Sequence, residues 1–137
     1  MKTYTLGLEE LDVLVEDVLK STQSSIVILR GDLASGKTTL VKKIVKKLGI
    51  MDEVTSPTFS LQQCYGDKVF HYDIYNHGLE HFISLGMLEE LDKDGLHFME
   101  WGDDELYKIL KDAGMEVLWI DIEKTSNNKR QYRVEYA

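Results

Sequence analysis

Residues 26–39 read IVILRGDLASGKTT, and this stretch decides the fold of the chain. The apolar run Ile26–Leu29 predicts a short buried strand. The spacing of Leu40, Val41, Ile44, Val45 and Leu48 predicts a helix over Gly36–Leu48 that ends at Gly49. Between them, Gly31–Thr38 matches G-x-x-x-x-G-K-[ST] at every fixed position. A loop of this pattern between a strand and a helix predicts a phosphate-binding loop, or P-loop.

The chemistry of the loop explains its spacing. Its glycines let successive backbone N–H groups point inward at phosphate oxygens, and the following helix adds its positive end to the same place. Lys37 is expected to reach the β- and γ-phosphates, and the Thr38 hydroxyl to ligate Mg²⁺. The expected ligands are therefore Mg²⁺ and a nucleoside triphosphate. The residues expected to bind the nucleotide here are Gly31, Asp32, Leu33, Ala34, Ser35, Gly36, Lys37, Thr38 and Thr39.

Hydrolysis of the nucleotide needs an acid at the end of a second buried strand. Glu100 follows Leu96–Met99, a mostly apolar run of the expected kind. Asp73 lies in the stretch HYDIY, where strand alternation puts it on one face with His71 and Tyr75. A carboxylate within a strand is costly to bury unless it is paired or near a cation, so Asp73 is either part of the site or on an exposed strand face. With Lys37, these two acids are the candidate catalytic residues.

The segment Val54–Phe59 follows the predicted helix and contains the only proline of the chain, Pro57. Switch loops that sense a γ-phosphate through a threonine hydroxyl occupy this place in P-loop proteins. Ser56 and Thr58 are the candidate switch residues, and an ordinary polar turn is the alternative.

The remaining pattern alternates helices with strands and hairpins. It predicts an α/β fold, namely a P-loop NTPase-like mixed sheet flanked by helices, in a single domain over residues 1–137. The expected elements are a helix over 8–20, a hairpin around Gly66-Asp67, a helix over Leu79–Leu91, a strand over Leu96–Met99, a helix over Asp103–Ala113, and two strands over Met115–Glu123 and Tyr132–Tyr136.

The composition limits the partners. A formal charge of −8 at pH 7 argues against broad electrostatic binding of nucleic acid, which needs clustered Lys and Arg. A single cysteine, Cys64, excludes an intramolecular disulfide and is expected to be a packed strand residue. The first 20 residues lack the uninterrupted apolar stretch of a signal peptide, and no later stretch is long enough to span a membrane, so we expect a cytoplasmic protein without a membrane partner.

Four short motifs, taken in order, resemble those of the TsaE family, formerly called YjeE. They are GDLASGKTTL at residues 31–40, TSPTFSL at 55–61, HYDIY at 71–75 and MEW at 99–101. The usual family pattern is G-D-L-G-A-G-K-T-T, then S-P-T-[FY]-x-L, H-x-D-L-Y-R and [IL]-E-W. The resemblance runs from about residue 7 to residue 136 and is carried by the combination of motifs.

This resemblance implies a small bacterial ATPase required for threonylcarbamoyladenosine modification of tRNA. It implies a P-loop α/β fold, Mg-ATP binding, slow ATP hydrolysis and a partnership with the TsaD and TsaB proteins, with tRNA reached only through that complex. The implied roles are magnesium binding by Thr38 and Glu100, positions near the γ-phosphate for Asp73 and Thr58, and contact with the nucleotide by Trp101 and Arg130. For Arg130, a plain surface charge is the alternative.

The chain departs from the family pattern at three places. Ala34-Ser35 replaces the usual Gly-Ala, Asn76 replaces the usual Arg, and Gly102-Asp103 follows Trp101 where Pro-Glu is commoner. None of these changes touches the residues expected to hold phosphate. They bear on turnover and on the partner surface.

Two other functions remain open at this stage. A small P-loop kinase usually needs a lid with arginines, and the only arginines here are Arg30, Arg130 and Arg133. A non-hydrolysing module, in which ATP only stabilises a surface for a partner, would need the loop but not the acids. Hydrolysis is the leading hypothesis because the intact loop, two acids and a candidate switch segment occur together.

Overall fold

The computed structural model describes residues 2–21, 26–31, 36–51, 62–66, 68–74, 78–101, 104–125 and 128–136. The predicted nucleotide residues Asp32–Ser35 and the switch residues Ser56 and Thr58 lie outside this part, as does the substituted Asn76. The elements in chain order are β1 (Lys2–Leu6), η1 (Leu8–Glu10), α1 (Asp12–Ser21), β2 (Ile26–Arg30), α2 (Lys37–Lys47), β3 (Gln62–Tyr65), β4 (Val69–Asp73), α3 (Gly78–Ser84), η2 (Met87–Asp92), β5 (Leu96–Glu100), α4 (Asp104–Asp112), β6 (Val117–Lys124) and β7 (Arg130–Tyr136).

The strands form one seven-stranded sheet in the order β1-β7-β6-β2-β5-β4-β3. Its middle is parallel, because β2 pairs in parallel with both β5 and β6, and β4 pairs in parallel with β5. The outer pairs are antiparallel: β3 with β4, β6 with β7, and β7 with β1. The predicted α/β fold with a mixed sheet is confirmed.

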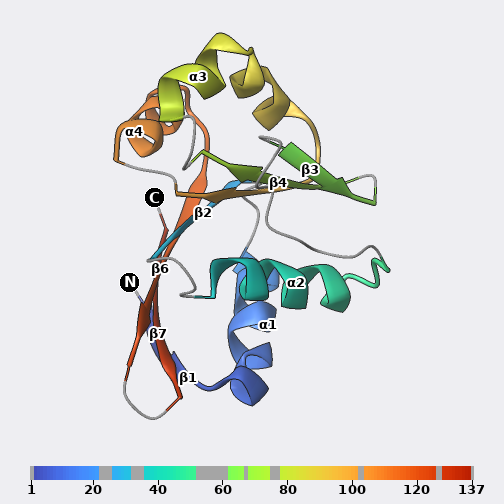
Figure 1. Ribbon diagram of the computed structural model, residues 1–137, viewed down its shortest axis with the longest axis vertical. Helices are drawn as coiled ribbons and strands as arrows, with labels where there is room; N and C mark the ends of the chain where they lie inside the picture. Colours follow the sequence, from blue (N-terminus) through green and yellow to red (C-terminus); the bar gives the residue numbers. More distant parts are fainter. Residues whose placement is uncertain are drawn as a thin grey trace.

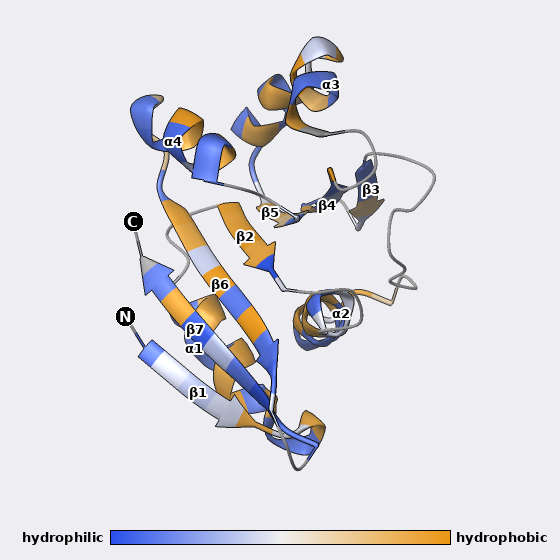
Figure 2. Cartoon of the chain, turned by 60° about the vertical axis from the view of Figure 1, so that its left-hand side comes forward, coloured by the Kyte–Doolittle hydropathy of each residue, from blue (hydrophilic) through white to orange (hydrophobic). Residues whose placement is uncertain are grey.

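Helices cover both faces of the sheet. Figure 1 shows α1 and α2 on one side of the strands and α3 and α4 on the other. Strand β2 explains the two cores, because its alternate side chains face opposite ways. Val27 and Leu29 pack in the core under α1 and α2, whereas Ile26 and Ile28 pack in the core under α3 and α4. The strand is therefore apolar on both faces, and Figure 2 shows it as an apolar ribbon between β6 and β5.

The register brings three strand ends to one place. Leu29 of β2 pairs with Glu100 of β5, and Glu100 pairs on its other side with Asp73 of β4. The carboxyl ends of neighbouring parallel strands are where open α/β sheets bind ligands. Both candidate acids therefore lie at the carboxyl ends of their strands, near the carboxyl end of β2, where the P-loop begins.

Two expectations from the sequence differ from the structure, and one strand was not expected. The predicted helix over Leu79–Leu91 is broken, because Gly86 has a φ of 74° and separates α3 from the 3₁₀ helix η2. Strand β1 was not predicted. Cys64 lies in β3 as expected, but its side chain is exposed instead of packed.

Across the described ranges, every helix is too short or too polar to cross a membrane.

Candidate nucleotide site at the carboxyl ends of the parallel strands

Helix α2 begins directly after a left-handed glycine. Gly36, the N-cap, has a φ of 115°, a backbone conformation that side chains other than that of glycine rarely adopt. A Cβ at this position would also lie 3.3 Å from Cδ and Nε of Arg130. The backbone conformation therefore favours glycine at the last position of the loop motif, and the contact with Arg130 leaves little room for a side chain. Arg130, at the start of β7, lies against the end of the loop.

Lys37 is folded back over the start of the loop. Its side chain is buried, and Nζ donates a 2.7 Å hydrogen bond to the carbonyl oxygen of Gly31. The same ammonium group lies 3.9 Å from the centroid of the Trp101 ring, a cation–π contact. The structure thus places Gly31, Lys37 and Trp101 together, three of the residues expected at the nucleotide.

Thr38 and Glu100 meet between the helix and the strand. The Thr38 hydroxyl in the first turn of α2 donates a 3.0 Å hydrogen bond to Oε2 of Glu100 at the end of β5. Glu100 is only 3% exposed, so its carboxylate lies in a place where it needs partners. Hard oxygen ligands of this kind suit Mg²⁺, which is usually held by one or two carboxylates and by substrate phosphates. The pair fits the predicted metal site.

Trp101 turns the chain sharply after Glu100. Its φ is 68°, one of two positive values at non-glycine residues in the described chain. A left-handed residue other than glycine costs about 1–2 kcal/mol, and such strain tends to occur at functional sites. The backbone N–H of Trp101 donates a 3.1 Å bond to the carbonyl oxygen of Leu29, which ties the end of β5 to the end of β2. This bond keeps Glu100 beside the start of the P-loop.

Asp73 is the second candidate acid. It is the last residue of β4, partly buried and paired in register with Glu100. The predicted alternation is present, because Phe70, Tyr72 and Ile74 all pack in the core under α3 and α4. Asp73 therefore points to the α2 side of the sheet, the side of the P-loop helix.

Sequence reasoning assigned no role to His71. The side chain is fully buried, and Nε2 contacts Oε2 of Glu100, the oxygen that also accepts the bond from Thr38. Its other ring nitrogen, Nδ1, lies 3.0 Å from the Tyr65 hydroxyl. The alternation in HYDIY had already placed His71 on the same face as Asp73, and that was the signal for it.

Thr39 differs from its neighbours in the motif. It lies in the first turn of α2 with an exposed side chain. The described site thus brings together Gly31, Gly36, Lys37, Thr38, Asp73, Glu100, Trp101 and Arg130.

Arg30 lies directly before the loop but is directed elsewhere. Its guanidinium stacks 4.8 Å from the Trp119 ring centroid and forms a 3.5 Å ion pair with Asp104 of α4. These contacts belong to a hollow of about 330 Å³ lined by Asp104, Tyr107, Trp119 and Glu135. Arg30 is therefore held by α4 and β6, and Arg130 is the arginine that lies against the loop.

Comparisons with known proteins show which family the chain belongs to. The sequence model of the family "Threonylcarbamoyl adenosine biosynthesis protein TsaE" matches residues 7–132. The tRNA threonylcarbamoyladenosine biosynthesis protein TsaE of Treponema pallidum is 40% identical over 84 residues, which cover 59% of this chain and 62% of that protein. The protein of the same name from Bacillus subtilis is 33% identical over 109 residues, covering 77% of this chain and 66% of that protein.

Length and fold complete the comparison. The alignments span 62%, 58% and 56% of the curated relatives from Treponema pallidum, Nostoc and Haemophilus influenzae. The crystal structure of Bacillus subtilis YdiB superposes with a TM-score of 0.70 and 24% identity over 99% of this chain and 86% of that one, which shows the same fold. Because the family model matches nearly the whole sequence, the chain belongs to the TsaE family.

Proposed function

We propose that this protein binds Mg-ATP at the carboxyl ends of β2, β5 and β4 and hydrolyses it. The observation that carries the proposal is the 3.0 Å hydrogen bond from the Thr38 hydroxyl to Glu100. It joins the P-loop helix to an acid on a neighbouring parallel strand. This is the arrangement in which P-loop NTPases hold magnesium and phosphate.

Each side chain has a distinct part in the proposal. The Lys37 ammonium group binds the β- and γ-phosphates, and Arg130 approaches the phosphates from β7. Thr38 and Glu100 would hold Mg²⁺, which when bound supplies positive charge to the phosphate oxygens. Asp73, beside Glu100 in the sheet register, orients the attacking water.

We further propose that ATP hydrolysis serves threonylcarbamoyladenosine biosynthesis on tRNA. The support is family membership and the names of the curated relatives. TsaD and TsaB are the proposed partners, in the cytoplasm. The formal charge of −8 suits a protein that reaches tRNA through this complex and not by its own surface.

The test is phosphate release from Mg-ATP by the purified protein, alone and with TsaD and TsaB. We expect Mg-dependent release by the wild type and loss of it in Thr38→Ala and Glu100→Ala. No release under either condition would refute hydrolysis. Full activity in both variants would refute the assigned metal residues.

Two further measurements on the same proteins separate the other functions. Transfer of the γ-phosphate to a nucleoside or metabolite acceptor would identify a kinase. A Glu100→Ala variant that binds ATP and still supports TsaD turnover normally would identify a non-hydrolysing assembly module.

A further inference from the structure

We propose that His71 is a positioning residue that fixes the Glu100 carboxylate for Mg²⁺ and that the β3–β4 hairpin holds His71 in place. The inference rests on the proposed Mg-ATP function and deepens it, because it adds a buried support behind the metal site.

Two hydrogen bonds converge on one oxygen of Glu100. A carboxylate only accepts hydrogen bonds, so Nε2 of His71 donates to Oε2, as does the hydroxyl of Thr38. Donors from β4 and from α2 then hold the same atom from two directions. The plane of the carboxyl group, and with it the direction of Oε1, is fixed. Neither member of the His71–Glu100 pair is exposed by more than a few per cent, so water does not loosen the contact.

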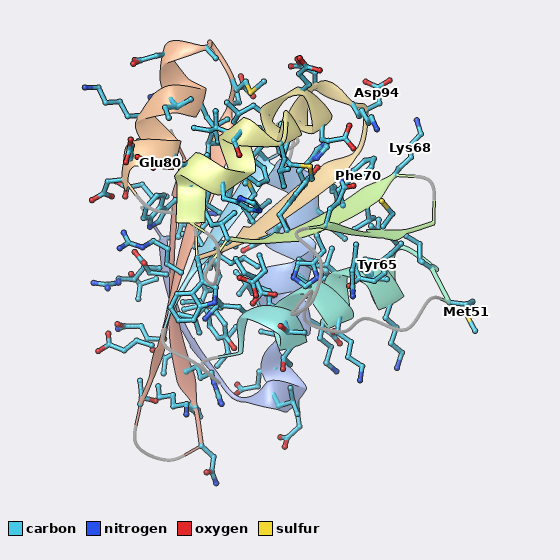
Figure 3. All side chains as sticks on the ribbon, turned by 45° about the horizontal axis from the view of Figure 1, so that its top comes forward. Met51, Tyr65, Lys68, Phe70, Glu80 and Asp94 are labelled. Carbon is cyan, nitrogen blue, oxygen red and sulfur yellow. The ribbon has the colours of Figure 1, made fainter. Side chains whose placement is uncertain are left out.

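The imidazole ring is held from the other side by the hairpin. Nδ1 of His71 lies 3.0 Å from the Tyr65 hydroxyl, which donates a 2.8 Å bond to Oε1 of Gln63. Gln63 pairs with His71 across the β3–β4 ladder. Figure 3 shows Tyr65 on the α2 side of the hairpin and Phe70 on the opposite side. Tyr65 is itself buried, at 3% exposure. The ring orientation of His71 is thus set by edge strand β3.

This arrangement has the chemistry of an outer partner to a metal ligand. Groups that orient a ligating side chain commonly change metal affinity about 10- to 100-fold when they are removed. Without His71, the buried carboxylate of Glu100 keeps one donor, Thr38, and loses its fixed direction. Lys37, the residue proposed to bind phosphate, is held by the Gly31 carbonyl oxygen and the Trp101 ring and not through the His71–Tyr65 contact. The effect therefore belongs to Mg²⁺ dependence and not to phosphate binding as such.

The experiment measures binding of a non-hydrolysable ATP analogue by calorimetry over a range of Mg²⁺ concentrations and in EDTA. For His71→Ala we expect the Mg²⁺ concentration for half-maximal binding to rise about 10- to 100-fold, with the affinity in EDTA unchanged. His71→Gln, which retains a donor near the position of Nε2, should recover much of the loss. Tyr65→Phe should shift the Mg²⁺ requirement in the same direction by less.

A double-mutant cycle tests the connection between the two residues. In the His71→Ala background, Tyr65→Phe should have no further effect on Mg²⁺ dependence, because its route to Glu100 is gone. The matched control is His97→Ala. His97 is equally buried and also contacts a tyrosine hydroxyl, but it lies at the other end of β5. It should lose stability and keep the Mg²⁺ dependence of the wild type.

The outcomes distinguish the two proposals. One outcome would overturn the positioning role and leave the proposed function standing. In it, the wild type binds the analogue in a Mg²⁺-dependent way, and a folded His71→Ala or Tyr65→Phe variant needs the same Mg²⁺ concentration as the wild type. Equal Mg²⁺ shifts in the His71→Ala and His97→Ala variants would also overturn it, since they would reflect general loosening. A wild type without Mg²⁺-dependent nucleotide binding would refute the proposed function and the inference with it.

Discussion

Strand β5 has a buried histidine at its amino end, His97, and contacts a second one, His71 of β4, through Glu100 at its carboxyl end. The two histidines are alike in most respects. His71 and His97 are both 0% exposed, and Nδ1 of each contacts a tyrosine hydroxyl, from Tyr65 at 3.0 Å and from Tyr72 at 2.7 Å. They differ in the partner of Nε2. That of His97 donates 2.8 Å to the backbone carbonyl oxygen of Lys93, and that of His71 contacts the Glu100 carboxylate.

The difference shows that burial and the number of partners do not identify a functional histidine. His97 also stacks on Phe70 at a centroid distance of 4.5 Å, and its aromatic partners Phe70 and Tyr72 lie within the core under α3 and α4. Its hydrogen bonds join β5 to Tyr72 of β4 and to the backbone of Lys93, which follows η2. The bonds of His71 lead to a side chain at the carboxyl end, where ligands bind in such sheets. The final partner of the hydrogen-bonded chain decides between the two roles.

The largest effect is expected at the amino end of β5, from Gly95→Ala. Gly95 has a φ of 137°, and a Cβ there would lie 2.3 Å from the carbonyl oxygen of Lys68. Backbone strain and the clash should together lower the free energy of unfolding by about 3 kcal/mol, measured by urea denaturation. Gly114→Ala is the control, with a φ of 79° and nothing within 4 Å of the added Cβ, so only strain remains. Equal losses in the two variants would contradict the clash.

At the carboxyl end, Glu100→Gln should lower kcat for Mg-ATP hydrolysis. The variant keeps the shape of the side chain but removes the charge, so we expect a loss of about 100-fold, or about 2.7 kcal/mol. Glu90→Gln is the matched change in η2, before the amino end of β5. Glu90 forms an ion pair with Lys93 at 2.8 Å and accepts a hydrogen bond from Gln62 at 3.3 Å. It should leave kcat unchanged. Equal effects on kcat would remove the distinction between the two ends.

The two tyrosines offer the most direct comparison. Tyr72→Phe removes the hydroxyl that contacts Nδ1 of His97, in a fully buried place. It should lower the free energy of unfolding by about 1–2 kcal/mol and leave Mg²⁺-dependent nucleotide binding unchanged. Thermal unfolding and calorimetry on the same samples give both values. A weakened Mg²⁺ dependence in Tyr72→Phe would show that the two hydrogen-bonded chains are not independent.

The smallest effect is a difference in pH dependence. Burial lowers the pKa of His97 from its ordinary value near 6.5. Below that value the unfolded chain takes up a proton that the folded chain excludes, so the free energy of unfolding falls as pH drops. The free energy of unfolding of His97→Gln should therefore fall less than that of the wild type as the pH is lowered from 7 to below 6.5. Urea denaturation at each pH measures both. Parallel curves for the two proteins would show that His97 does not exclude the proton.

Local patterns predicted much of this fold and part of its site. The strand, loop and helix around Gly31–Thr38 follow from residues adjacent in sequence, and Glu100 was recognisable at the end of an apolar run. The role of His71 was not, because its partner comes 29 residues later and only the pairing of β4 with β5 brings them together. Strand β1 was missed for a similar reason. Its residues Lys2–Leu6 are mostly exposed and pair with β7 from the opposite end of the chain.

The contact between Lys37 and Trp101 provides an intrinsic fluorescence signal near the loop. An ammonium group 3.9 Å from an indole ring alters the emission of that ring, and phosphates that draw Lys37 away from it would change the fluorescence. The other tryptophan, Trp119, lies 4.8 Å from the Arg30 guanidinium and donates a 2.9 Å hydrogen bond to Asp121. Its fluorescence should therefore contribute a constant background to the signal of Trp101. For the proposed Mg-ATP function, we therefore expect nucleotide binding to change the tryptophan fluorescence, which can be followed in real time without an attached dye.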